Sequence, residues 1–210
     1  MESAGVLFAV AVAILLGAMS PGPSLVVVAR TAMARSRGQG VLTALGMGIG
    51  GGIFALVALA GLQLILSAVP SVYRALQIAG ATYLLYIAHR LWITAPEPLD
   101  LVGNEEADQD SKVRVFLLGL GTQLSNPKTA IVYASVFTAA LPEQASWTIS
   151  VVLVSLIFVV EFGWYAVVAV AFSTGRARNV YIRGKTWIDR LAAGAMGALG
   201  VKVISDIRAT

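Results

Sequence analysis

Long apolar runs separated by short charged segments constrain this chain more than any other feature of its sequence. A helix that crosses the hydrocarbon core of a bilayer needs about 20 mostly apolar residues. Six stretches approach or exceed that length with almost no charged residue inside them, the last being the shortest. They are Val6–Val28, Val41–Leu66, Ala75–Ile93, Val115–Ala140, Trp147–Phe172 and Leu191–Ile204. The pattern predicts six transmembrane helices.

The composition excludes the other broad classes of protein. Of the 210 residues, 58% are hydrophobic and 12% are charged, whereas soluble domains contain about 25% charged residues. A chain of this length cannot hide so much apolar surface from water. A transmembrane β-barrel is built from short strands of alternating polarity, which long apolar runs do not provide. The absence of cysteine excludes disulfides and thiolate metal sites. We therefore expect an all-α membrane protein.

The basic residues are distributed unevenly over the connecting segments. Eleven Lys and Arg residues lie in or beside the connectors that follow the first, third and fifth apolar stretches, and three lie on the opposite side. Basic residues in short loops stay in the cytoplasm. This asymmetry predicts a multi-pass membrane protein with both termini on the outer side. It also accounts for the net charge of +4 without a nucleic-acid partner.

A faint internal repeat divides the chain into two similar halves. The segment Ser20–Val27 aligns with Asn126–Tyr133, and Ala79–Ala81 aligns with Ala193–Ala195. Three spans are an odd number, so a second copy has to enter the membrane from the opposite side, as in the inverted repeats of many secondary transporters. We expect one transmembrane domain over residues 1–210, with three-helix repeats at 4–93 and 115–207 and an acidic cytoplasmic loop at 94–114.

Prolines at matching places interrupt the first and fourth apolar stretches. Pro21 and Pro23 lie in the first and Pro127 in the fourth. Proline removes a backbone donor and breaks or kinks a helix. Such breaks persist inside a membrane only where protein or a water-filled cavity satisfies the freed backbone groups. The matched pair therefore predicts helix breaks at a substrate-binding site.

The same motifs resemble those of a known transporter family. Ser20-Pro21-Gly22-Pro23, the glycine-rich Gly46–Gly51, Gly80–Tyr86 and Leu124-Ser125-Asn126-Pro127-Lys128 are similar to segments of the lysine exporter (LysE/RhtB) family. The resemblance covers essentially the whole chain. It implies a secondary exporter of amino acids or closely related small zwitterionic metabolites across the inner membrane. It also implies that the proton gradient or the membrane potential drives export.

The predicted site combines polar and charged groups around the two breaks. Lys128 lies inside an apolar stretch, where a lysine costs about 2.5–3.5 kcal/mol and usually faces a cavity or a partner. We expect it either to hold a substrate carboxylate or to form a structural pair. The candidate substrate-binding residues are Ser20, Pro21, Gly22, Pro23, Ser24, Gln123, Asn126, Pro127 and Lys128.

Glu161 is the one acidic residue deep inside an apolar stretch. A buried carboxyl group can gain and lose a proton during a transport cycle. We expect Glu161 to act either as a proton-coupling group or as a counter-charge for a substrate ammonium or for Lys128. A Glu–Lys pair that only fixes helix packing is the alternative.

Other functions are less compatible with the residues present. The single histidine, His89, lies at the end of an apolar stretch, and neither a Gly-x-Ser-x-Gly motif nor a phosphate-binding Gly-x4-Gly-Lys motif occurs. We therefore expect no enzyme, no cofactor and no metal site. A metal-ion exporter of related architecture and a membrane scaffold without transport stay open. The expected partners are an amino acid and the lipid bilayer. Small-residue motifs in the glycine-rich helix 41–66 permit close contact within the chain or across a homodimer.

Overall fold

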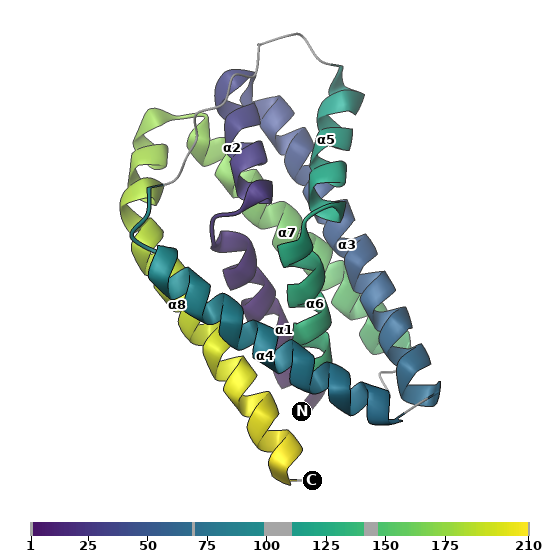
Figure 1. Cartoon of the computed structure of the whole chain (residues 1–210). Helices are drawn as coiled ribbons and strands as arrows, with labels where there is room; N and C mark the ends of the chain where they lie inside the picture. The colour runs from purple at the N-terminus through teal and green to yellow at the C-terminus, as the bar shows by residue number, and fades with distance from the viewer. Residues whose placement is uncertain (1, 69, 99–110, 141–146, 210) are drawn as a thin grey trace.

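The computed structural model describes residues 2–68, 70–98, 111–140 and 147–209, and over these ranges it contains helices and no strands. The all-α prediction is confirmed. The helices in the described part of the chain are α1 (Glu2–Met19), α2 (Pro23–Ala34), α3 (Arg37–Ala68), α4 (Pro70–Thr94), α5 (Lys112–Leu124), α6 (Pro127–Ala140), α7 (Trp147–Phe172) and α8 (Gly175–Ala209). Figure 1 shows them packed side by side, with the start of α1 and the end of α8 at the same end of the bundle.

Both predicted helix breaks are present. The first separates α1 from α2, and the two helix axes differ in direction by 58°. The second separates α5 from α6. In each case the second helix begins with proline, Pro23 in α2 and Pro127 in α6. Proline suits the first helical position because its missing N–H has no partner there in any case. Pro23, rather than Pro21, is therefore the structural counterpart of Pro127.

The lengths and polarities of the helices identify only some of the six predicted spans. Arg37–Gly61 of α3 and all of α7 are long and apolar enough to cross a membrane, and the bent pair α1–α2 adds a third crossing if it counts as one span. These are the candidate spans among the described residues. The six-span arrangement consequently stays a prediction.

Glycines of α3 allow neighbouring helices to approach its backbone closely. A Cβ atom added at Gly46 would collide with the backbone of Phe116 and Leu120 in α5, and one added at Gly48 would collide with Phe162 in α7. From the other side, a Cβ at Gly119 of α5 would collide with the carbonyl of Thr43. These close approaches are made within the chain, so a homodimer would have to use other residues of α3.

The last helix differs from its prediction, because α8 begins at Gly175 rather than near Leu191. Much of the expected connector is therefore helical. Two of its charged residues are buried: Lys185 forms an ion pair of 2.9 Å with Asp189 one turn later. The Lys185 ammonium also donates to the carbonyl of Ala95, just beyond α4 (3.1 Å).

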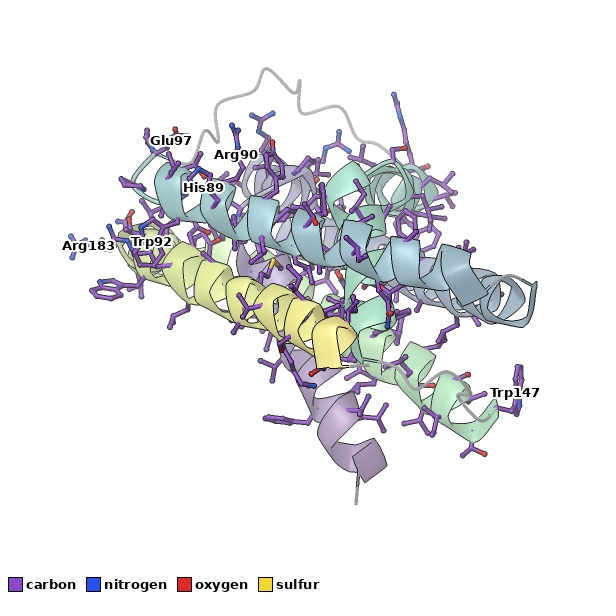
Figure 2. All side chains as sticks on the ribbon, turned by 60° about the horizontal axis from the view of Figure 1, so that its bottom comes forward. His89, Arg90, Trp92, Glu97, Trp147 and Arg183 are labelled. Atoms are coloured by element: carbon purple, nitrogen blue, oxygen red, sulfur yellow. The ribbon has the colours of Figure 1, made fainter. Side chains whose placement is uncertain are left out.

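The two ends of the bundle carry different side chains. Figure 2 shows Trp147 at one end, and His89, Arg90, Trp92, Glu97 and Arg183 gathered at the other. Trp92 and Trp147 are exposed, at 56% and 80%, as expected for aromatic anchors near membrane boundaries. Most of the expected acidic loop, residues 99–110, lies outside the described residues.

Candidate functional site

The two helix breaks meet at one small cavity in the middle of the bundle. Its volume is about 20 Å³, which is room for about one water molecule. Polar groups from both breaks line it together with apolar and aromatic side chains from α1, α6 and α7. The lining residues are Ile14, Gly17, Ala18, Ser20, Gly22, Ser24, Leu25, Asn126, Lys128, Thr129, Val132, Tyr133, Glu161 and Tyr165.

A chain of hydrogen bonds joins the first break to the second. The Asn126 side-chain amide donates to the Ser24 hydroxyl (3.0 Å), and that hydroxyl donates to Oε1 of Gln123 (2.6 Å). All three side chains are at most 5% exposed. Buried polar groups have to be paired to be tolerated, and here α2 pairs with both sides of the α5–α6 break.

The same chain continues into α7 and ends at Glu161. The Gln123 amide donates to Oε2 of Glu161 (3.2 Å), and the Tyr133 hydroxyl donates to Oε1 (2.9 Å). Both carboxyl oxygens thus accept a hydrogen bond inside the protein. Gly51 of α3 faces this pair, since a Cβ added there would lie 3.0 Å from the Tyr133 hydroxyl. Glu161 is therefore held by neutral donors.

Lys128, one residue into α6, reaches across to the end of α1. Its ammonium donates to the carbonyls of Gly17 and Ser20, at 3.3 Å each. The ion pairs of the described residues do not include one between Lys128 and Glu161, although both line the cavity. The last four carbonyls of a helix have no partner within the helix and carry partial negative charge, which explains why a lysine is placed there.

Two aromatic side chains complete the contacts at the end of α1. The Trp164 indole of α7 donates to the carbonyl of Ala18 (3.0 Å), and the Tyr181 hydroxyl of α8 donates to the carbonyl of Met19 (3.0 Å). Burial, with a smaller contribution from Asp189, raises the pKa of Tyr181 above its ordinary value, so its hydroxyl stays protonated and able to donate. Side chains from α6, α7 and α8 thus bind four successive carbonyls at this helix end.

The hydroxyl of Ser20 has no partner in this arrangement. Ser20 is 2% exposed and lines the cavity, and its Oγ is buried without a hydrogen bond. A buried hydroxyl without a partner costs about 1–3 kcal/mol. It is therefore a group in the cavity that is free to bind a ligand or a water molecule.

Most of the predicted site residues are brought together. Ser20, Gly22, Ser24, Asn126 and Lys128 line the cavity with Glu161, and Gln123 connects two of them. The prolines set the backbone course: Pro21 is half-buried and Pro23 is exposed. Pro127 begins α6, and its side chain lies outside the described residues.

Three aromatic contributors to the site carried no specific signal in the sequence. They are Tyr133 of α6, Trp164 of α7 and Tyr181 of α8. Their importance comes from hydroxyl and indole donors that reach glutamate or backbone oxygens on other helices. Aromatic residues are common on apolar helices, so only the three-dimensional arrangement distinguishes them.

A second, larger cavity lies between α3, α4 and α6. Its volume is about 450 Å³, and it is lined mainly by apolar groups, including Val57, Ile131 and Phe137. None of the predicted site residues lines it. Among the described residues, no group of three His, Cys, Asp or Glu side chains is arranged to hold a metal ion.

Comparison with known proteins identifies relatives along nearly the whole chain. The threonine efflux protein of Escherichia coli K12 is 30% identical over 194 residues, which cover 89% of this chain and 91% of that protein. The threonine efflux protein of Salmonella typhi is 31% identical over 198 residues, covering 94% and 96%. The leucine efflux protein of Klebsiella pneumoniae is 23% identical over 181 residues, covering 86% and 84%.

No solved structure gives a significant match. The family described as LysE type translocator matches residues 15–206, a range that contains both helix breaks and every residue that lines the polar cavity except Ile14. The chain therefore belongs to the LysE family of integral membrane translocators.

Proposed function

We propose that this protein is a secondary active exporter of amino acids, or of closely related small zwitterionic metabolites, across the inner membrane. The observation that carries the proposal is the meeting of two proline-initiated helix breaks at one polar cavity. Interrupted helices at corresponding places are the arrangement through which many secondary transporters bind their substrates. The names of the relatives, threonine and leucine efflux proteins, favour an amino acid as the substrate.

The groups around the cavity are suited to a zwitterion. Ser20, Ser24 and Asn126 offer neutral hydrogen-bonding groups, and Glu161 offers an acceptor for an ammonium group. The helix that begins at Pro127 points its N-terminal end toward the break, where partial positive charge favours a carboxylate. We propose these residues, with Pro21, Gly22, Pro23, Gln123 and Lys128, as the substrate-binding site.

Transport requires the cavity to enlarge. A volume of about 20 Å³ holds a water molecule but no amino acid, so the proposed site has to widen before it can bind a substrate. Two inverted repeats, residues 4–93 and 115–207, would supply the necessary movement by rocking against each other. Their contacts support this proposal, because α3 packs against α7 and α4 packs against α8, each helix against its proposed counterpart.

We also propose how the chain is oriented in the membrane, what drives export and where a homodimer would form. We propose six spans with both termini outside, the loop 94–114 in the cytoplasm, and export driven by the proton gradient or the membrane potential. Glu161 is the proposed coupling group, because it is the carboxylate that the hydrogen-bonded chain joins to both breaks. A homodimer would form through surfaces of α3 that its glycine contacts leave unused.

Counterflow in proteoliposomes tests the proposed function. Vesicles containing the purified protein are preloaded with one unlabelled amino acid at a time and given labelled L-threonine or L-leucine outside. An exporter of amino acids accumulates label above the level of protein-free vesicles. Absence of counterflow for every amino acid, from protein shown to be folded, would overturn the proposal.

Two variants connect that assay to the site. Ser24→Ala removes the hydroxyl through which α2 meets both sides of the second break, and we expect counterflow to fall by about tenfold or more. Ser205→Ala is the matched control, since the Ser205 hydroxyl is exposed and donates only within its own helix. If the two variants transport equally, the cavity is not the substrate site. Glu161→Gln should abolish any dependence of counterflow on pH if Glu161 couples a proton.

A further inference from the structure

The Lys128 ammonium occupies a position that has the chemistry of an ammonium-binding site. The carbonyls of Gly17 and Ser20 accept hydrogen bonds from it at the C-terminal end of α1. An ammonium group carries three donors and no acceptor. Carbonyl oxygens at a helix C-terminus, with their partial negative charge, are suitable partners for such a group.

Independent evidence for a ligand comes from Ser20. Its hydroxyl is fully buried, lines the same cavity and has no partner, while its carbonyl binds Lys128. The carbonyls of Ala18 and Met19 are already bound by Trp164 and Tyr181. The acceptors open to exchange at this helix end are therefore the Ser20 hydroxyl and the two carbonyls that Lys128 covers.

We propose that Lys128 is an internal stand-in for the α-ammonium group of the substrate. When an amino acid enters, its ammonium displaces that of Lys128 from the carbonyls of Gly17 and Ser20 and binds the Ser20 hydroxyl. When the cavity is empty, Lys128 returns. This inference rests on the proposed function and assigns the two ends of the substrate: the ammonium lies toward α1, and the carboxylate lies toward the start of α6.

The physical reason lies in what the closed state must satisfy. Carbonyls left unpaired in a closed cavity within the membrane are energetically costly, because neither water nor lipid is there to bind them. A loaded carrier satisfies them with substrate, whereas an empty carrier has only Lys128 to do so. The flexible four-carbon stem of a lysine lets its ammonium move aside and return without any change of the helix backbone. Lys128 thus makes closure possible in the absence of substrate.

This role separates two transport modes. Net efflux into substrate-free medium requires the empty carrier to close and reorient in every cycle. Exchange of internal for external substrate uses only the loaded carrier. Removal of the lysine ammonium should therefore impair net efflux much more than exchange, whereas a purely structural role of Lys128 would make both modes fall together.

The test compares both modes in proteoliposomes loaded with labelled L-threonine, or with labelled L-leucine if only leucine shows counterflow. We expect Lys128→Met to reduce net efflux about tenfold more than it reduces exchange, each measured relative to the unmodified protein. Lys202→Met is the matched control, because its ammonium is exposed and pairs only weakly with Asp206 at 3.8 Å. Lys128→Arg, which keeps charge and donors, should retain more net efflux than Lys128→Met.

Equal losses of net efflux and exchange in a folded Lys128→Met protein would overturn the inference while leaving the proposed function intact. Absence of counterflow in the unmodified protein would instead overturn the proposed function itself. A measurement on unmodified protein guards against misfolding of the variant. External L-threoninol (L-leucinol in the leucine case), which keeps the ammonium, should stimulate efflux of label, whereas the corresponding α-hydroxy acid should not. The opposite preference would overturn the inference.

Discussion

The two helix breaks differ in where their backbone groups find partners. At the α5–α6 break the partners are local: the N–H of Ser125 donates to Gly121, the N–H of Asn126 donates to Gln123, and the Asn126 side chain accepts from the N–H of Lys128. At the α1–α2 break the N–H of Ser20 also has a local partner, the carbonyl of Leu16, but the carbonyls of residues 17–20 are bound by side chains of α6, α7 and α8. The residue before α2, Gly22, has no side chain to cap it.

This difference indicates that the two helix breaks, although similar in sequence, have different roles. A break that satisfies its own groups keeps its shape when its neighbours move. A break whose carbonyls are bound by side chains from three other helices has a geometry that depends on the positions of those helices. We infer that the α5–α6 break is the fixed side of the proposed site and the α1–α2 break the adjustable side.

The largest expected effect concerns the packing that holds the fixed side in place. A methyl group at Gly119 would collide with the backbone carbonyl of Thr43, because α5 and α3 are in backbone contact there. We expect Gly119→Ala to destabilise the protein by about 3 kcal/mol or to prevent folding. Thermal unfolding in detergent measures this. Gly121→Ala is the control on the same helix, since its added Cβ would meet no atom of a neighbouring helix within 4 Å, and the variant should be at least as stable as the unmodified protein because alanine favours a helix more than glycine does.

Removing side-chain donors on α7 and α8 tests whether the α1–α2 break depends on other helices for its stability. Trp164→Phe and Tyr181→Phe each leave one carbonyl at the end of α1 without its donor, at a cost of about 1–3 kcal/mol. We expect each variant to lower the unfolding temperature. Trp187→Phe, at a tryptophan that is 69% exposed, should leave that temperature unchanged. A Trp164→Phe protein as stable as the Trp187→Phe control would contradict the proposed dependence on other helices.

A substitution at Asn126, in the α5–α6 break, should have a smaller effect on stability. Asn126→Ala removes the acceptor for the N–H of Lys128 and should cost about 1 kcal/mol, as other N-cap losses do. Asn126→Asp keeps that acceptor but loses the donor to Ser24. We expect the Asp variant to be more stable than the Ala variant, while transport is impaired in both. Thermal unfolding and counterflow on the same preparations separate the two roles. Equal stability would show that the cap is unimportant.

Gly22 should give the smallest effect. Its backbone is extended, and an added Cβ would lie 3.7 Å from the Lys128 ammonium, an ordinary contact distance. We expect Gly22→Ala to change stability by less than about 0.5 kcal/mol, as measured by thermal unfolding. A large loss of stability would mean that the first break is as rigid as the second, which would remove the distinction between them.

The positions of the breaks could be predicted from the sequence because proline acts locally. Pro23 and Pro127 each prevent the preceding helix from continuing through them, because proline lacks the N–H that helical bonding requires and its ring clashes with the preceding turn. Polar residues in apolar stretches were informative for a similar reason: Lys128 and Glu161 cannot face lipid cheaply, so a cavity or partner was expected.

The partners themselves could not be predicted, because they depend on how helices pack. Lys128 was expected to hold a substrate carboxylate or to form a structural pair, yet it binds backbone carbonyls, which have no signature in a sequence. The glycines of α3 predicted a close contact with another helix but did not identify that helix. In the structure the contacts are with α5 and α7. The N-terminal part of α8 was predicted to be a connector because it is rich in charged residues, and the carbonyls of Thr94 and Ala95 that bind the Lys185 ammonium lie in a distant part of the chain.

The contacts at the end of α1 also have a consequence for biosynthesis. Their donors lie at positions 128, 164 and 181, more than a hundred residues after the carbonyls they bind. Because a nascent chain emerges from its N-terminus onward, the first helix break enters the bilayer long before its partners are made. The carbonyl of Met19 obtains its donor only after Tyr181 of the last helix has been made. A ribosome that stops after the first half would release a product with an exposed, unsatisfied helix end, a feature by which quality-control proteases could recognise unfinished copies.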